Sequence, residues 1–110
     1  MTGYKFEKCT KDGSVQYRLI HTGRFWNTSK DVFLYRNSSG VYVCSASYKG
    51  DSADSKFLAG ESANKLAEIL KKQGLNRKKL MSASFPKGAD QRALDCWGMI
   101  LSCISFSSKR

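Results

Sequence analysis

Histidine occurs only once in this 110-residue sequence, at His21, and the four cysteines stand far apart, at positions 9, 44, 96 and 103. Zinc sites usually draw their ligands from closely spaced pairs of cysteine and histidine. The sequence therefore predicts no metal site and no cofactor. An even number of cysteines leaves disulfides open, but cysteines scattered among apolar residues usually behave as small buried side chains. We expect reduced, mostly buried thiols.

Sequence motifs of the common enzyme classes are also missing. The chain contains no phosphate-binding P-loop, no G-x-S-x-G nucleophile motif and no H-E-x-x-H metal motif, so it predicts no catalytic residues and a nonenzymatic protein. A metal-independent ribonuclease is a minor alternative. In it His21 would act as the base and Glu7 as the acid, with Arg18 or Lys5 holding a phosphate. The strand register expected below places His21 and Glu7 on opposite faces, which opposes this alternative.

Long apolar runs are absent too. No segment approaches the length of a membrane span, and the first residues lack the apolar core of a secretory signal. We therefore expect a soluble protein of the cytoplasm, or of the nucleus or another intracellular compartment of a host, with no membrane partner. The oligomeric state does not follow from these features.

Acidic residues are few. Nine Asp and Glu against 19 Lys and Arg give a formal net charge of +10, which surrounds the molecule with a positive potential. Such a potential favours acidic partners, with nucleic acid (DNA or RNA) first and an acidic protein second. The apolar content of 41% and the length are typical of one globular domain, so we expect residues 1–110 to form a single domain.

The first part of the sequence predicts an antiparallel hairpin. Asp12-Gly13 is a strong signal for a two-residue turn between strands at 4–10 and 15–22. This turn sets Glu7 opposite Arg18 on one face and apolar pairs on the other, as a half-buried hairpin requires.

A second hairpin is predicted from an apolar segment at 32–36, turn-forming residues at 37–40 and a further apolar segment at 41–48. A four-residue turn would place Tyr35 directly opposite Tyr42. Both rings would then lie on the face of the sheet that points away from the core.

Two helices are predicted after the strands. Residues 61–72 carry apolar side chains with helical spacing, and Gly74 suits the left-handed residue that ends a helix. A second helix at 89–106 has a broad apolar face that needs a sheet to pack on. With loops at 21–31 and 49–60, the sequence predicts an α+β domain of order ββββαα, with a four-stranded antiparallel sheet.

The densest positive charge lies between residues 65 and 79, where six basic residues accompany one acid. Basic side chains gathered at a helix end and the following turn can contact several phosphates and release their counterions. Lysines that merely suit a solvated helix end are the alternative. We predict a nucleic-acid contact through Lys65, Lys71, Lys72, Arg77, Lys78 and Lys79.

Aromatic residues near cations predict a second contribution. In the expected sheet Tyr35 and Tyr42 stand with Phe33 near Lys5 and Arg18. Rings beside cations can stack unpaired bases, which favours single strands. Burial of the same rings under a helix is the alternative reading.

The expected loop at 21–31 contains Arg24, Phe25 and Trp26, residue types that are frequent in binding hot spots. These side chains would either contact a partner or fold into the core. An exposed arrangement would fit an inhibitor or adaptor of the viral or mobile-element type, which docks on an acidic or nucleic-acid-handling protein.

Overall fold

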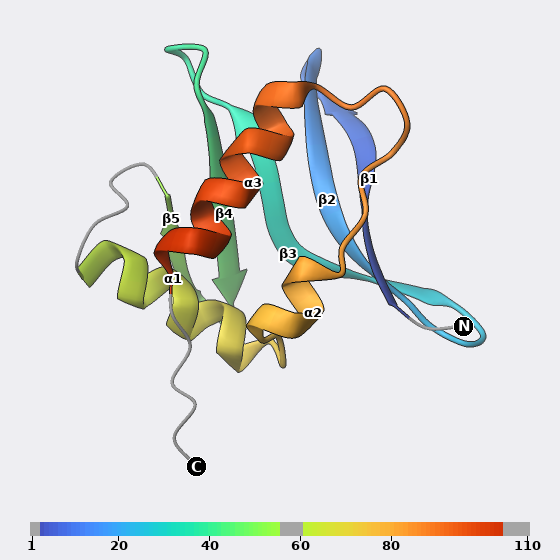
Figure 1. Cartoon of the computed structure of the whole chain (residues 1–110), viewed down its shortest axis with the longest axis vertical. Helices are drawn as coiled ribbons and strands as arrows, with labels where there is room; N and C mark the ends of the chain where they lie inside the picture. The colour runs from blue at the N-terminus through green and yellow to red at the C-terminus, as the bar shows by residue number, and fades with distance from the viewer. Residues whose placement is uncertain (1–2, 56–60, 105–110) are drawn as a thin grey trace.

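Five antiparallel strands form one sheet in chain order in the computed structural model, which describes residues 3–55 and 61–104. Helices follow the strands (Figure 1), so the predicted α+β class is confirmed, while the predicted four strands and two helices are too few. The elements are β1 (Gly3–Lys11), β2 (Ser14–Thr22), β3 (Asn27–Arg36), β4 (Tyr42–Tyr48), β5 (Asp51–Asp54), α1 (Glu61–Lys72), α2 (Arg77–Met81) and α3 (Gln91–Cys103).

The β1–β2 hairpin has the predicted register. Glu7 pairs with Arg18 and Phe6 with Leu19 across a turn at Asp12-Gly13. Both turn residues have positive φ, 51° at Asp12 and 79° at Gly13, as a two-residue turn that follows the twist of the strands requires.

The β3–β4 hairpin forms with a register that differs from the predicted one by one residue. Tyr35 pairs with Val43 rather than with Tyr42. Asn37 accounts for the difference, because its backbone N–H donates to the Val41 carbonyl at 2.8 Å and its side-chain oxygen accepts from the Val41 N–H at 3.0 Å. The loop is therefore longer than expected, and a shift of one residue turns every side chain of β4 to the other face.

Two segments expected to be loops contribute strands. β3 begins at Asn27, and its first part continues the pairing with β2 beyond a bulge at which residues 30–32 lie opposite Leu19. β5 returns beside β4 through a tight turn at Lys49-Gly50, whose φ values are 48° and 85°. Residues 56–60 of the second expected loop lie outside the described residues.

Helix α1 ends as predicted at Gly74, whose φ is 82°. The Gly74 N–H donates to the Lys71 carbonyl at 2.9 Å, and the Leu75 N–H donates to the Leu70 carbonyl at 3.1 Å. This pair of hydrogen bonds satisfies the carbonyls that the helix end leaves open. Leu70 and Leu75 are both buried, so the helix end is anchored in the core.

Helix α2 was not predicted, whereas α3 occupies most of the range expected for the last helix. Asn76 caps α2 by accepting from the Lys79 N–H at 2.8 Å, and Asp90 caps α3 by accepting from the Arg92 N–H at 3.0 Å. The expected continuation of the last helix through 105–106 lies outside the described residues. The predicted apolar face is confirmed by its buried members, Ala93, Cys96, Trp97 and Ile100.

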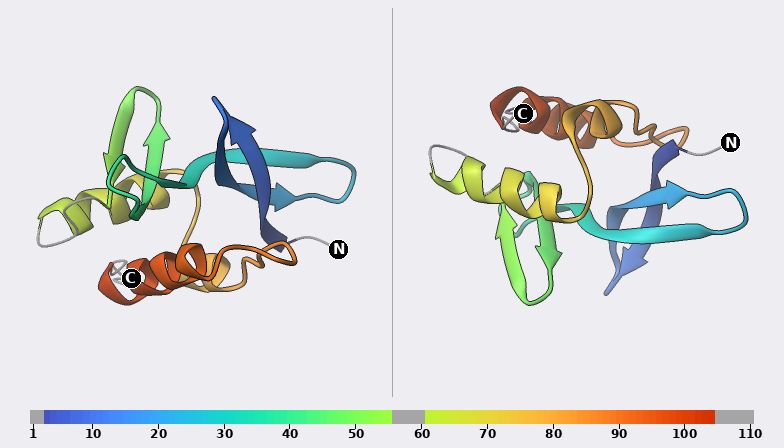
Figure 2. Two further views of the ribbon diagram at one scale, coloured as in Figure 1. Left: turned by 90° about the horizontal axis from the view of Figure 1, so that it is seen from above. Right: turned by 90° about the horizontal axis from the view of Figure 1, so that it is seen from below.

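The helices pack on one face of the sheet, as both views of Figure 2 show. Alternate residues of the strands join the helices in a single core, among them Phe6, Leu34 and Cys44. We call the opposite face the outer face, and no helix of the described residues covers it. Ser84 lies along the free edge of β1, where the Phe6 N–H donates to the Ser84 carbonyl at 2.7 Å.

Candidate nucleic-acid interface

Four exposed lysines lie where α1 ends and α2 begins, and we call them the basic corner: Lys71, Lys72, Lys78 and Lys79. Only residues 73–76 separate the two pairs, because Gly74 ends one helix and Asn76 starts the next. None of the four forms an ion pair with a carboxylate in the part of the chain that the structure describes. Lys72 lies close enough to Asp51 to help lower the pKa of that carboxyl, and the exposed charges of all four lysines can attract an anion.

Two lysine ammonium groups also form hydrogen bonds with backbone carbonyls just after α1. Lys79 donates to the Gly74 carbonyl at 3.0 Å, and Lys30, from β3, donates to the Gln73 carbonyl at 3.2 Å. Cations at this position suit the negative end of the helix dipole, which is the purely structural reading of the corner. An ammonium group has three donors, so Lys79 keeps two for a further partner.

Arg77 has a different role from the one that the sequence predicted. Its guanidinium donates to the backbone carbonyls of Leu101 and Ile104, at the C-terminal end of α3. Those carbonyls have no partner within the helix, so Arg77 acts as a cap that ties α2 to α3. The structure thus gives Arg77 a role within the fold, and a phosphate contact through its remaining donors stays a prediction.

Lys65 does not belong to the basic corner, because its charge is paired with a carboxylate. It forms an ion pair with Asp51 of β5 at 3.3 Å. The hydrogen bond and charge of Lys65 lower the pKa of the Asp51 carboxyl below its usual range. Lys65 thus links α1 to the edge of the sheet.

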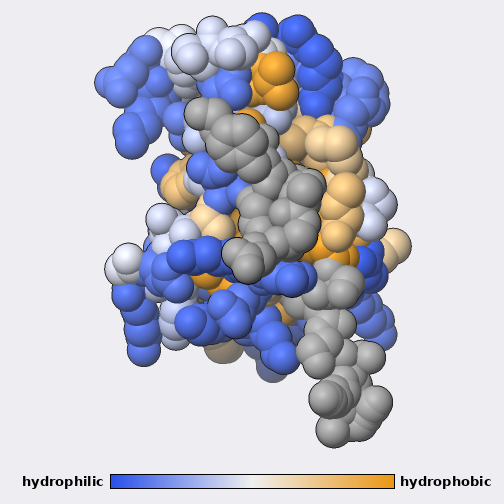
Figure 3. Space-filling view, turned by 90° about the vertical axis from the view of Figure 1, so that its left-hand side faces the viewer, coloured by the Kyte–Doolittle hydropathy of each residue, from blue (hydrophilic) through white to orange (hydrophobic). Residues whose placement is uncertain are grey.

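Figure 3 shows the side of the molecule on which α1 lies. Among the coloured residues of this view, hydrophilic ones gather at the top and bottom, and apolar ones lie between them.

On the outer face, Arg18 and Phe33 are neighbours, as the sequence predicted. The guanidinium lies over the ring with its central carbon 5.7 Å from the ring centroid. Lys5 instead forms an ion pair with Glu7 at 3.4 Å. A hollow of about 600 Å³ opens here and is lined by Cys9, Thr10, Lys11, Gln16, Arg18, Phe33, Tyr35 and Ser45.

Several residues that line this hollow were not predicted from the sequence. Gln16 and Lys11 were not singled out, although each lies an even number of residues from a residue already placed on the outer face. Because alternate residues of a strand share a face, that signal was present in the sequence. Ser45 could not be placed without the correct register of β4.

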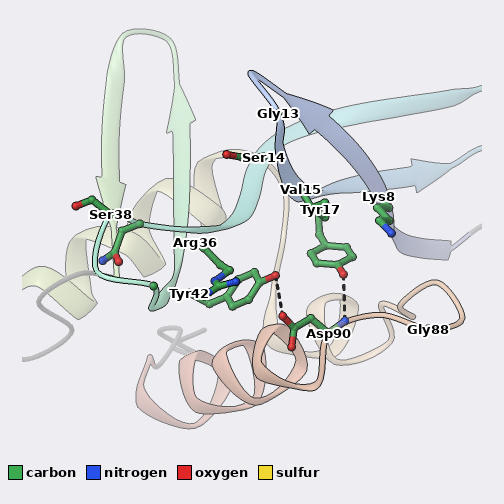
Figure 4. Close-up of a pocket in the computed structure, with 12 residues that line it drawn as sticks. Lys8, Gly13, Ser14, Val15, Tyr17, Arg36, Ser38, Tyr42, Gly88 and Asp90 are labelled. Carbon is green, nitrogen blue, oxygen red and sulfur yellow. Dashed lines mark hydrogen bonds between the residues drawn. The ribbon is translucent and has the colours of Figure 1, made fainter.

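Tyr42 does not belong to the outer face, and its predicted place beside Tyr35 is wrong. It is 8% exposed and lies in the core beneath the helices. Its hydroxyl donates to the Asp90 carboxylate at 3.3 Å, as Figure 4 shows. Burial, followed by the charge of Asp90, raises the pKa of Tyr42.

Tyr17 and Tyr42 anchor the N-terminal end of α3 to the sheet through Asp90, as the dashed lines in Figure 4 show. The Asp90 N–H donates to the Tyr17 hydroxyl at 3.1 Å, while the Asp90 carboxylate caps the helix. The hydrogen bonds from Arg92 hold the pKa of Asp90 below its usual range. Lys8 and Arg36 line the hollow beside this cap, but Asp90 already has partners there, so we read this cluster as structural.

The turn between β2 and β3 presents two large rings to solvent. Phe25 is 82% exposed and Trp26 is 73% exposed, and the Arg24 guanidinium lies 5.9 Å from the Phe25 ring centroid. The turn closes through a hydrogen bond from the Gly23 N–H to the Trp26 carbonyl at 3.0 Å. A Cβ at position 23 would lie 2.4 Å from that carbonyl oxygen, so only glycine fits. Of the two arrangements that the sequence left open, the structure has the exposed one, and contact with a partner stays a prediction.

The groups considered for catalysis do not come together. His21 stacks on Tyr4 with ring centroids 4.7 Å apart, whereas Glu7 lies on the outer face. Within residues 3–55 and 61–104, no group of three or more His, Cys, Asp and Glu is arranged to hold a metal. No helix in these two ranges has the length and apolar composition needed to cross a membrane.

All four cysteines are free thiols in the structure, but only two of them are buried. Cys44 and Cys96 lie in the core, Cys9 is half-buried and Cys103 is exposed. Burial raises the pKa of Cys96 to about 11. The prediction of mostly buried thiols therefore fails at Cys103, which faces solvent near the end of α3.

No protein family model, no curated protein and no solved structure matches this chain.

Proposed function

We propose that this protein is a nonenzymatic nucleic-acid-binding protein that contacts phosphates through the basic corner. The observation that carries the proposal is the exposure of Lys71, Lys72, Lys78 and Lys79 without an ion pair among the described carboxylates. The net charge of +10 adds a field that attracts a polyanion from a distance. Phosphate contacts of this kind position a protein without reading the base sequence.

A mobility-shift assay with duplex and single-stranded oligonucleotides tests this proposal. The variant Lys78→Ala/Lys79→Ala should weaken binding to all sequences alike. Lys49→Ala/Lys87→Ala is a matched control, because it removes the same charge from two exposed lysines elsewhere on the surface. If both double variants weaken binding equally, the effect comes from net charge alone and the corner is not the site.

The second candidate is a protein-binding adaptor or inhibitor, and the exposed rings of Phe25 and Trp26 favour it. Large exposed aromatic side chains beside an arginine resemble the anchors of protein interfaces. The positive surface would then engage an acidic partner and speed its association. This candidate predicts a partner that survives nuclease treatment in a pull-down and is lost in the variant Phe25→Ser/Trp26→Ser.

The two candidates imply different behaviour of the same variants. A nucleic-acid-binding protein loses affinity when the basic corner is changed and keeps it when Phe25 and Trp26 are changed. An adaptor shows the reverse for its protein partner. For either role we propose an intracellular location, in the cytoplasm or the nucleus, where nucleic acids and the proteins that handle them occur.

A further inference from the structure

The hollow on the outer face contains an arginine whose hydrogen-bonding capacity is incompletely used. The Nε atom of Arg18 is buried and finds no hydrogen-bond partner among the described residues. A buried donor without a partner costs free energy. The guanidinium carries further N–H groups, and Arg18 lines the hollow, so these groups can donate to a ligand there. The position of the guanidinium over the Phe33 ring fixes the side chain within the hollow.

Two aromatic rings that line the hollow lie two residues apart on β3. Phe33 and Tyr35 are half-buried on the same face. Residues two apart on a strand are separated by about 6.6 Å, whereas bases of a duplex strand are about 3.4 Å apart. Two neighbouring bases must therefore separate to meet both rings, which a single strand permits and a base-paired duplex does not.

The charge of the hollow fits a polyanionic strand. Lys11 and Arg18 both line it, and none of its described lining residues is acidic. Glu7, the acid nearest in register to Arg18, forms its ion pair with Lys5 instead. The amide of Gln16 and the hydroxyl of Ser45 supply donors and acceptors suited to base edges.

We propose that the hollow on the outer face binds unpaired nucleotides of a single-stranded nucleic acid, with bases stacked on Tyr35 and on the paired Arg18 guanidinium and Phe33 ring, and a phosphate held by Arg18. This inference rests on the proposed function and specifies its substrate class. The basic corner supplies attraction to any nucleic acid, and the outer face adds affinity for strands whose bases are free to stack.

Fluorescence anisotropy with three labelled oligonucleotides tests the inference: an oligothymidylate, an abasic strand with the same number of phosphates, and a duplex. The wild-type protein should bind the oligothymidylate more tightly than the abasic strand. Phe33→Leu and Tyr35→Leu should each weaken oligothymidylate binding by about 5- to 140-fold, the range of one stacked base. Neither substitution should change the affinity for the abasic strand or the duplex.

Phe25→Leu is the matched control, because Arg24 lies over Phe25 at 5.9 Å much as Arg18 lies over Phe33 at 5.7 Å. It should leave all three affinities unchanged. Equal weakening by Phe25→Leu and Phe33→Leu overturns the assignment to the hollow. Arg18→Gln tests the hollow from a strand other than β3. It should weaken oligothymidylate binding, and the midpoint of its urea unfolding curve shows whether the variant is folded.

The outcomes separate this inference from the function on which it rests. Equal wild-type affinity for the oligothymidylate and the abasic strand overturns the stacking site without the use of any variant, and leaves phosphate binding by the basic corner intact. If wild-type protein binds none of the three oligonucleotides, the proposed function fails and the inference fails with it.

Discussion

The guanidinium of Arg77 donates to the backbone carbonyl of Ile104, and a second donor of the same fork reaches Leu101. Helix α2 thus contributes the group that closes the end of α3. A residue that charge patterning assigns to an interface is engaged within the fold. The charge available at the basic corner is therefore carried by its four lysines.

Replacing Arg77 with Ala should destabilise the protein by about 2–3 kcal/mol, because it removes charged hydrogen bonds and leaves half-buried carbonyls without partners. Urea unfolding measures this change. Lys78→Ala, at an exposed neighbouring position, should cost less than about 0.5 kcal/mol. Equal stability of the two variants would contradict the capping role of Arg77. The salt dependence of nucleic-acid binding should not change in Arg77→Ala.

The cap at Asp90 predicts a specific pH dependence of stability. Its pKa is lowered in the folded protein, chiefly by the hydrogen bond from the Arg92 N–H. The stabilisation is therefore complete above the ordinary carboxyl pKa of about 3.9 and is lost as the pH falls through the lower, folded value. Asp90→Asn retains a capping side chain but cannot titrate. Between about pH 7 and about pH 3, the variant should lose less stability than wild type. If urea unfolding shows the same loss of stability in both proteins, the pH dependence does not come from the titration of Asp90.

The cysteines should differ in reactivity because only thiolates react readily. Cys103 is exposed, whereas burial raises the pKa of Cys96 to about 11 and raises that of Cys44 further. In the native protein a thiol reagent should label Cys103 first and should reach Cys44 and Cys96 only after unfolding. A titration in denaturant without reductant should count four thiols. A count of zero would show two disulfides and would contradict the expectation of reduced cysteines.

Local signals made much of the fold predictable. The Asp12-Gly13 turn fixes the register of the first hairpin through its own geometry, and Gly74 ends α1 because it tolerates positive φ. The same kind of signal was present but overlooked at Lys49-Gly50, which turns the chain into β5. These features depend on a few adjacent residues, so a sequence reveals them.

The features that escaped prediction depend on particular contacts that patterns of residue type do not reveal. Asn37 lengthens the second turn through two hydrogen bonds with Val41, and the register that results directs Tyr42 to the core. The first residues of β3 are polar and lack the alternation of apolar side chains that predicts a strand. They pair with β2 beyond a bulge, which the sequence does not reveal. Arg77 meets its partner Ile104 27 residues further along the chain. No local sequence pattern predicts this contact. The run of basic residues around Arg77 therefore favoured an interface role for it.

The salt dependence of duplex binding tests the central claim most directly. If each lysine of the basic corner contacts one phosphate, log affinity should fall with log salt at a slope of about −3.6, from a factor of roughly 0.9 per contact. Lys78→Ala/Lys79→Ala should reduce the steepness of that slope by about 1.8, while Lys49→Ala/Lys87→Ala should leave it unchanged. An unchanged slope in a folded Lys78→Ala/Lys79→Ala protein would contradict the account, because its main phosphate contacts would then lie elsewhere.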